Sequence, residues 1–398
     1  MIYRTLGKTG KKIGIIGLGC EHLDHKPYAQ VKETVDAALE NGVNIFDVFM
    51  PKEEVRRNIA KALGTRRKDV FIQGHIGSTV LNHQNNISRD MKEVKKYFED
   101  LLRIFDGYID LGMMFFIDTE IDYKNVFETE FADYVQKLKS AGSIGNIGFS
   151  SHNPATAMKA IQTGLPDMMM FSINPAFDML PSEEYVFDHF EKKFGTTLFR
   201  GLDPKRAALY QLCEQKQIGI TVMKTLGAGR LISPEYTPFE KPLTVAQCIH
   251  YALSRPAVSS VMLGCQTASE VENAMQYFQM TSEEKDYSSI ISSVRNDFAG
   301  NCVYCSHCEP CPSEIDIAAV NKYLAIADLT PDDIPSTIRA HYQSLVHRGN
   351  ECISCGSCEA RCPFGVPIME NMMKAESWNR HKTARLQKCL LDRDAQNA

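Results

Sequence analysis

The sequence of 398 residues lacks the features that would direct it to a membrane or to nucleic acid. It contains no apolar run long enough to span a bilayer. It has no excess of basic residues, because 44 Lys and Arg stand against 49 Asp and Glu, giving a formal net charge of -5. The apolar stretch within residues 1–19 is too short and too glycine-rich for a signal peptide, and no cleavage pattern follows it. These absences predict a soluble cytoplasmic protein without a nucleic-acid or membrane partner.

Short apolar segments alternate with amphipathic segments from residue 12 to about residue 280. The apolar segments, each predicted to be a strand, are residues 13–19, 44–49, 70–76, 108–116, 146–151, 168–174, 219–225 and 258–264. The segments between them, such as RDMKEVKKYFEDLLRIF (89–105), place apolar residues three and four positions apart, which is typical of helices. Near-continuously apolar strands separated by helices indicate parallel strands covered on their outer face.

Eight such units predict an α/β fold, a (β/α)8 TIM barrel, with its site at the carboxyl ends of the strands. An open doubly wound sheet is the alternative, but GIIGLG (14–19) lacks the glycine spacing of its nucleotide-binding fingerprint. The connection over residues 175–204 is long and rich in aromatic residues. Long connections of this kind usually cover or shape a site, although a peripheral insertion is the alternative.

Eight of the 13 cysteines lie in two runs, CVYCSHCEPCP (302–312) and CISCGSCEARCP (352–363), each ending on Cys-Pro. Thiolates at this spacing hold a 4Fe–4S cluster, and in two-cluster ferredoxins the Cys before Pro ligates the other cluster. The predicted ligands are Cys302, Cys305, Cys308 and Cys362 for the first cluster, and Cys352, Cys355, Cys358 and Cys311 for the second. Structural zinc and a purely structural role for the clusters are the alternatives. We therefore expect a barrel over residues 1–285 and a mainly helical ferredoxin-like domain over residues 286–398.

Segments at the predicted strand ends resemble the aldo-keto reductase superfamily in the right order along the chain. They are YRTLGKTGKKIGIIGLG (3–19), GVNIFDV (42–48), RKDVFIQGHIG (67–77), DGYIDLGMMFF (106–116), GSIGNIGFSSH (142–152) and VMKTLGAGRL (222–231). Together with the cysteine tail, the sequence resembles the ferredoxin-fused branch of that superfamily. The resemblance implies a (β/α)8 barrel that binds NADPH across its mouth and transfers a hydride to a carbonyl. The family does so with an Asp, a Tyr as general acid, a Lys and a His.

This sequence matches only the first member of that tetrad, at Asp47. Lys52 stands where the Tyr is implied, His75 where the Lys is implied, and Phe115 where the His is implied. Because no phenol is left to protonate an alkoxide, ordinary carbonyl reduction is not expected. Asp47, Lys52 and His75 are predicted to surround one point and to handle protons, while Phe115 makes a wall for a flat hydrophobic substrate. The alternative is a degenerate site whose polar residues only satisfy one another.

The resemblance also implies positions that contact a nicotinamide nucleotide. LGAGR (226–230) resembles the pyrophosphate loop after the seventh strand, where glycines let backbone amides approach a phosphate. The implied contacts are Leu226, Gly227 and Gly229 in this loop, with Ser150 and Asn174 near the nicotinamide. Residues 264–274 lack the basic residue often used for a 2′-phosphate, so NADP(H) and NAD(H) are both retained as candidate cofactors.

These features together predict an iron–sulfur oxidoreductase. Two 4Fe–4S clusters would pass electrons to or from a small-molecule substrate, or a nucleotide, at the barrel mouth, with an external electron carrier as a partner and an anaerobic setting. Two alternatives stay open. One is an NAD(P)H-dependent carbonyl reductase with a rebuilt site, and the other is a non-catalytic electron-transfer or assembly subunit.

Overall fold

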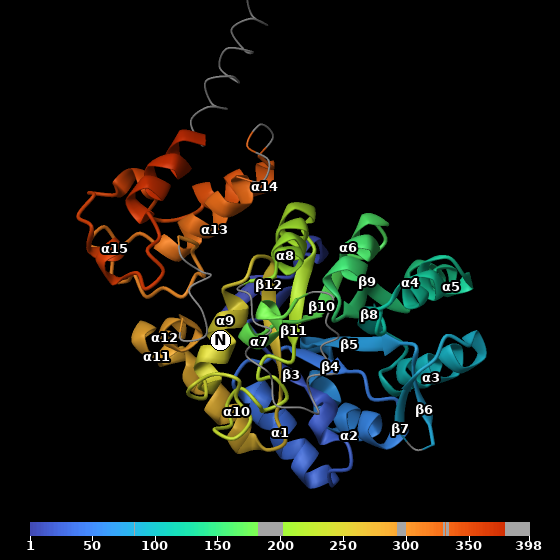
Figure 1. Cartoon of the computed structure of the whole chain (residues 1–398). Helices are drawn as coiled ribbons and strands as arrows, with labels where there is room; N and C mark the ends of the chain where they lie inside the picture. Colours follow the sequence, from blue (N-terminus) through green and yellow to red (C-terminus); the bar gives the residue numbers. More distant parts are fainter. Residues whose placement is uncertain (83, 182–201, 293–299, 329–330, 332–333, 379–398) are drawn as a thin grey trace, which may run out of the picture. The chain divides into compact units, whose positions relative to one another are not determined.

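The computed structural model describes residues 1–82, 84–181, 202–292, 300–328, 331 and 334–378 (Figure 1). Contacts between Cα atoms divide the chain into two compact units, Met1–Thr281 and Ser282–Ala398. This division falls close to the proposed boundary after residue 285. Among the described residues, no helix is both long enough and apolar enough to cross a membrane.

Eight parallel strands close into a barrel in the first unit (Figure 1). They are β3 (Ile16–Gly19), β4 (Ile45–Val48), β5 (Phe71–Ile76), β8 (Ile109–Met114), β9 (Ile144–Ser151), β10 (Met168–Ser172), β11 (Gly219–Met223) and β12 (Val258–Gly264). Their order around the barrel follows the chain, and pairing of β12 with β3 closes it. All eight predicted strands are confirmed, and the closed barrel excludes the open doubly wound sheet.

The first predicted strand, residues 13–19, is divided between two elements. Its first part belongs to β2 (Lys12–Gly14), which pairs antiparallel with β1 (Tyr3–Thr5), and only Ile16–Gly19 enters the barrel. A second hairpin, β6 (Ser78–Leu81) with β7 (Gln84–Ile87), follows β5 and was not predicted. Both hairpins lie outside the closed sheet.

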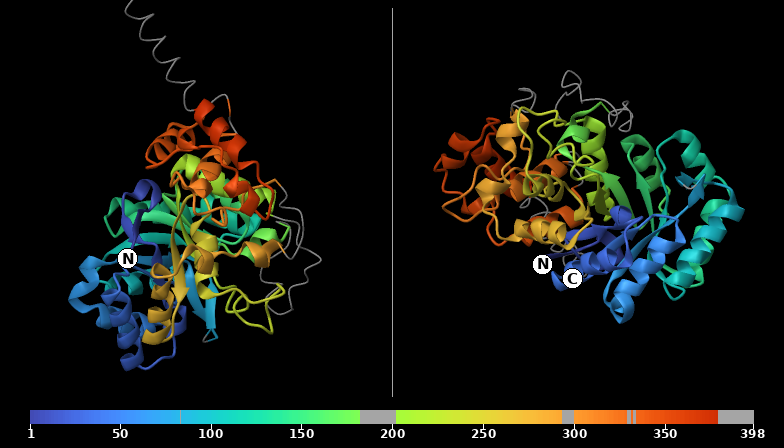
Figure 2. Two further views of the ribbon diagram at one scale, coloured as in Figure 1. Left: turned by 90° about the vertical axis from the view of Figure 1, so that its left-hand side faces the viewer. Right: turned by 90° about the horizontal axis from the view of Figure 1, so that it is seen from below.

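Helices surround the strands of the barrel (Figures 1 and 2). They are α1 (Tyr28–Glu40), α2 (Glu53–Leu63), α3 (Met91–Ile104), α4 (Glu120–Phe127), α5 (Glu130–Ser140), α6 (Pro154–Gln162), α7 (Pro175–Met179), α8 (Pro204–Lys216), α9 (Val245–Leu253) and α10 (Ala268–Met275). Helix α3 shows why such segments fold: Asp90 caps its first turn by accepting from the Lys92 amide, and its apolar residues face the core. Of the connection between residues 175 and 204, residues 182–201 lie outside the described residues, so its role stays a prediction.

Methionine and branched aliphatic side chains fill part of the barrel interior. The cluster consists of Leu6, Ile13, Ile45, Leu111, Met113, Met168, Met170 and Met262. Gly148 on β9 gives Met113 and Met168 room, because a Cβ there would lie 2.4 Å from the sulfur atom of each. Met170 lies next to the polar residues of the barrel, since its Sδ is 3.2 Å from Gln73 Nε2.

The described elements of the second unit are all helical. They are α11 (Ser282–Lys285), α12 (Ser288–Ser292), α13 (Ile317–Ala327), α14 (Ser336–Gln343), the 3-10 turn η7 (Gly349–Glu351), α15 (Ser357–Arg361) and a helical segment at residues 368–378. Buried residues of α13 and α14, including Val320, Leu324 and Ile338, supply its apolar core. A mainly helical second unit was expected, whereas its likeness to ferredoxins stays a prediction.

Candidate active site and cysteine pocket

The carboxyl ends of β4 and β5 bring Asp47 and His75 together inside the barrel. His75 Nε2 lies 2.8 Å from Asp47 Oδ1, and the two residues are 2% and 5% exposed. Gln73, on the same face of β5 as His75, donates to the same Oδ1 at 2.7 Å. Its Oε1 accepts from Thr221 Oγ1 of β11 at 3.0 Å. This buried network fixes the Asp47 carboxylate from two sides.

The other ring nitrogen of His75, Nδ1, differs from Nε2 in its hydrogen bonding. Among the described residues no hydrogen-bond partner is found for the buried His75 Nδ1. The ring meets Phe49 and Phe115 edge-on, with centroid distances of 6.1 Å and 5.2 Å. Because Nε2 faces the Asp47 carboxylate, Nδ1 is the ring nitrogen whose hydrogen-bonding capacity is left unused among the described residues.

Lys52 makes its described contacts elsewhere. It precedes α2, and its Nζ forms an ion pair with Asp24 Oδ2 at 2.7 Å and lies 2.6 Å from His25 Nε2. No described hydrogen bond or ion pair joins Lys52 to Asp47 or His75. Of the three predicted catalytic residues, the structure therefore brings two into contact. Asp24 was missed by the sequence analysis because its contact with Lys52 joins the loops after β3 and β4, and neither loop carries a local signal of this pairing.

Phe115 lies where an apolar wall was predicted. It stacks on Phe49 with a centroid distance of 5.7 Å, and Phe116 follows at 5.9 Å. All three rings belong to partly exposed residues at the carboxyl ends of β4 and β8. They offer a bound molecule an aromatic surface beside the His75 ring.

Two of the residues implied in nucleotide binding, Ser150 and Asn174, use their side chains to form hydrogen bonds with the backbone. Ser150 Oγ accepts from the Phe116 amide at 2.9 Å. Asn174 caps α7 by accepting from the Phe177 amide at 2.9 Å and donates to the Lys224 carbonyl at 2.8 Å. Both side chains therefore fix the ends of neighbouring strands, and their contact with a nicotinamide stays a prediction.

The glycine loop after β11 has a left-handed backbone. Gly227, Ala228 and Gly229 are left-handed, with φ of +57°, +55° and +83°. A Cβ at Gly229 would meet no atom within 4 Å, so the loop is open on this side. The amides of Gly227 and Gly229 donate to the carbonyls of Lys224 and Leu226 within the loop. Contact of this loop with a phosphate stays a prediction.

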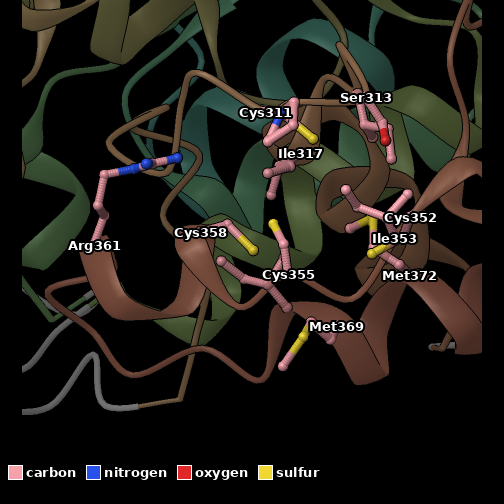
Figure 3. A pocket seen from close by; sticks show the side chains of 13 residues that line it. Cys311, Ser313, Ile317, Cys352, Ile353, Cys355, Cys358, Arg361, Met369 and Met372 are labelled. Atoms are coloured by element: carbon pink, nitrogen blue, oxygen red, sulfur yellow. The ribbon is translucent and has the colours of Figure 1, made fainter.

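Four cysteines from both runs line one pocket in the second unit (Figure 3). They are the four ligands predicted for the second cluster: Cys311, Cys352, Cys355 and Cys358. All four are free thiols, and Figure 3 shows them arranged around the same space. That space measures about 370 Å³ including its opening to solvent, and side chains such as Ile317 and Met372 complete its lining. A set of four thiols around an open space fits the donor set of a 4Fe–4S cluster.

The four thiols predicted for the first cluster also interact. Burial raises the pKa of Cys305 to about 11, with smaller contributions from Asp286 and Cys362. Burial likewise raises the pKa of Cys308, with contributions from Cys302 and Cys305. Of the second run, Cys362 is thus the cysteine that affects the pKa of Cys305.

The two runs share an unusual backbone. Tyr304 and Ser306 in the first run, and Ser354 and Gly356 in the second, have φ between +54° and +73°. These residues occupy the same places relative to the cysteines, two and four positions after the first Cys. Left-handed residues in such loops turn successive amides toward one concave side, which forms anion-binding nests found at many Fe–S sites. The two runs therefore repeat in structure as well as in sequence.

Arg361 connects the two runs. Its Nη2 donates to the carbonyls of Cys308 and Pro310, the latter at 2.7 Å. Among the described residues, no three His, Cys, Asp or Glu side chains form a group that could hold a metal ion. This finding supports neither a structural zinc ion nor a 4Fe–4S cluster at these runs. Iron–sulfur binding stays a proposal.

Comparison with known proteins places the first unit in a family. Residues 14–244 match the Aldo/keto reductase family. Over 205 aligned residues the chain is 27% identical to 4-dihydromethyl-trisporate dehydrogenase of Mucor mucedo. The aligned part makes up 46% of this chain and 62% of that relative. The chain thus spans less than two thirds of that relative's length, and both names agree with the expected oxidoreductase class.

Solved structures share the fold. The holo form of aldo-keto reductase AKR11C1 from Bacillus halodurans matches 75% of this chain and 97% of its own, with a TM-score of 0.57 and 19% identity. A putative aldo-keto reductase from Pseudomonas aeruginosa matches 70% of this chain and 96% of its own, with a TM-score of 0.52 and 17% identity. The family match spans more than half of the 398 residues and includes Asp47 and His75. The chain belongs to the aldo/keto reductase family.

Proposed function

We propose that this protein is an iron–sulfur oxidoreductase of the ferredoxin-fused branch of its superfamily. It moves electrons through two 4Fe–4S clusters to or from a small molecule at the barrel mouth, with an external electron carrier as partner. The observation that carries the proposal is the pocket that Cys311 of the first run shares with Cys352, Cys355 and Cys358 of the second. Such crossing of ligands between runs is the arrangement of two-cluster ferredoxins.

The chain's own residues hold and orient these groups. When bound, the clusters supply single electrons. The left-handed residues of each run would offer backbone amides to an anionic cluster, and Arg361 links the second run to the first. In the barrel, the fixed Asp47 carboxylate orients His75, so that Nδ1 can hold or release a proton at a bound molecule.

The same geometry argues against ordinary carbonyl reduction. Position 52 carries an ammonium paired with Asp24 instead of a phenol, and position 115 carries a phenyl ring instead of an imidazole. His75 with Asp47 remains as a proton donor beside an aromatic wall. Reduction of a double bond or another activated bond in a flat molecule suits these groups better than reduction of a simple ketone.

Metal analysis of the full chain tests the cluster proposal. Protein purified without oxygen should be brown and should hold about eight iron atoms, as two clusters require. Cys355→Ala should remove about half of the iron, because Cys355 lines the pocket proposed for the second cluster. The matched control is Cys213→Ala, which changes a buried thiol of α8 and should leave the iron content unchanged. A colourless protein that holds only zinc would contradict the proposal.

A second candidate is the NAD(P)H-dependent carbonyl reductase with a rebuilt site. The left-handed glycine loop at residues 227–229 supports it, and so does the dehydrogenase named among the relatives. Titration with NADPH and NADH, followed by nucleotide fluorescence, separates the two candidates. Tight binding of either nucleotide in iron-free protein, with hydride transfer to a ketone, would favour this second candidate. Failure of both candidates would leave a non-catalytic electron-transfer or assembly subunit.

A further inference from the structure

A second buried Asp–His pair lies at the carboxyl end of the barrel, and neither proposed function uses it. His152 follows β9, and Asp118 follows β8. His152 Nδ1 is 3.0 Å from Asp118 Oδ2, and the His152 amide donates to Asp118 Oδ1 at 2.6 Å. Ser151 Oγ donates to the same Oδ1 at 3.1 Å. The two residues of the pair are only 6% and 4% exposed.

The surroundings of Asp118 keep it charged. Burial by itself would raise the pKa of this carboxyl, but its contacts with His152, and then with Ser151, outweigh burial and lower the pKa below its usual value. A charged carboxylate that accepts from Nδ1 fixes the orientation of the His152 ring. Like Asp47 with His75, the pair sets an imidazole nitrogen against a buried carboxylate, through Nδ1 in His152 and through Nε2 in His75.

Aromatic rings connect the two pairs. Phe115 meets the His75 ring at 5.2 Å, Phe116 lies 5.9 Å from Phe115, and Phe116 meets the His152 ring at 5.2 Å. The four strands concerned, β4, β5, β8 and β9, are consecutive neighbours in the barrel. Two imidazoles therefore border one aromatic surface made of two partly exposed phenyl rings.

The backbone at Phe116 is held in an unfavourable conformation. Its φ is +57°, a left-handed value that bulky residues rarely adopt and that costs free energy. Three hydrogen bonds fix this turn: the Phe116 amide donates to Ser150 Oγ at 2.9 Å, and Arg89 Nη2 donates to the carbonyls of Phe115 and Phe116 at 2.9 Å and 2.8 Å. Strain that neighbouring groups maintain is typical of functional sites, and here it occurs in the residue whose ring contacts His152.

We propose that His152, oriented by Asp118, is a second proton donor, and that the substrate is a planar conjugated molecule reduced at a C=C bond. This deepens the proposed function and depends on it. Saturation of the bond takes two electrons and two protons. The electrons arrive singly from a one-electron carrier, one proton leaves the His75 imidazolium and the other leaves that of His152, and water protonates both rings again. Delivery of a hydride would bring one hydrogen with both electrons and would need only one proton donor.

Isotope incorporation into one product tests the proposal. The probe is benzylideneacetone, a planar conjugated enone, with reduced methyl viologen as electron donor and full-length protein in deuterated water. We expect saturated 4-phenylbutan-2-one that carries deuterium at the benzylic carbon, because both added hydrogens come from exchangeable donors. In a second reaction NADPH replaces the viologen. A saturated product that then carries protium at the benzylic carbon would show hydride transfer and would overturn the proposal. The unsaturated alcohol as product, or no turnover by protein that holds its iron, would overturn the substrate class.

Variants of the pair test the role of His152. His152→Gln should lower kcat about 100-fold, the usual contribution of a general acid, while the iron content and the Kd of the probe stay unchanged. Asp118→Asn should lower kcat less, and Asp118→Glu, which restores a carboxylate, should recover part of the loss. His250→Gln, which changes a histidine of α9 beside Tyr277, is the control and should keep full activity. Wild-type kcat in His152→Gln would overturn the role.

Folding and the iron content keep the outcomes distinct. If His152→Gln unfolds because Asp118 is left without its partner, the double variant Asp118→Asn/His152→Gln removes the buried charge and allows the same measurement. Its kcat should also fall about 100-fold, and a wild-type value would again overturn the role. Protein without iron would contradict the proposed function itself, whereas iron-loaded protein that does not reduce the probe contradicts only this inference.

Discussion

The two units of the chain differ in what fills their interiors. In the barrel, hydrogen-bonded strands close on themselves, and a Cβ at position 148 would lie 2.4 Å from the sulfur atoms of Met113 and Met168, which fill part of the interior. In the second unit, Cys311, Cys352, Cys355 and Cys358 surround open space. The barrel interior needs no bound group to complete it, whereas the space between the four thiols leaves room for the ligand proposed above.

The largest expected effect is a difference in stability between the two units after the proposed iron is removed. Treatment with an iron chelator after mild oxidation should unfold the second unit and leave the barrel intact, because binding energy of a metal group is also folding energy. Limited trypsin digestion with mass spectrometry should then show cleavage rising about tenfold or more at residues 300–328 and 334–378, while cleavage at residues 1–82, 84–181 and 202–281 does not rise. Protein incubated with the oxidant alone is the control. Equal resistance of both units would show that the cysteine unit does not depend on its ligand.

A smaller effect is expected from filling the barrel interior. Gly148→Ala should lower the free energy of unfolding of the barrel by about 1–3 kcal/mol, because the new Cβ would lie 2.4 Å from the sulfur atoms of Met113 and Met168. Gly19→Ala is the matched control, since its Cβ would meet its nearest neighbour, the Leu263 carbonyl, at an ordinary 3.4 Å. Urea unfolding followed by circular dichroism measures both. If Gly148→Ala lowers the free energy of unfolding no more than Gly19→Ala does, the side chains of Met113 and Met168 move to make room for the new methyl group.

The smallest effect is a pH dependence of the barrel. Asp118 has a lowered pKa in the folded protein, from contacts with His152 and Ser151 that outweigh burial. Its charge therefore stabilises the fold above the ordinary pKa of an aspartic acid, and this stabilisation is lost as the pH falls through the lowered value. The stability difference between the wild type and Asp118→Asn should be constant near neutrality and should shrink in acid. A difference that is the same at every pH would show that the His152 contact leaves the Asp118 titration unchanged.

The barrel could be predicted from the sequence because its signals are local. Each strand is a short apolar run and each helix has its own period, so eight repeats specify the closed sheet without knowledge of any long-range contact. The division of residues 13–19 between β2 and β3 was missed, because an apolar run does not show where a hairpin ends and a barrel strand begins. The hairpin of β6 with β7 was missed because its strand of residues 84–87, QNNI, is mostly polar.

The candidate site was predicted only in part. Asp47 and His75 could be placed together because neighbouring parallel strands end at the same edge. Gln73 could have been found from the alternation along β5, which puts it on the same face as His75. The pairing of Lys52 with Asp24 had no local signal, since two separate loops approach each other only in the folded barrel.

Arg361 has a consequence for the order in which the protein acquires its structure during synthesis. It holds the carbonyl of Cys308, a residue that leaves the ribosome 53 positions earlier. The first cysteine run therefore waits, without its fourth predicted thiol and without this anchor, until the second run has been made. The barrel, whose last strand ends at Gly264, can close before either run is complete. The order of synthesis therefore lets the barrel form before the cysteine unit has all of its contacts.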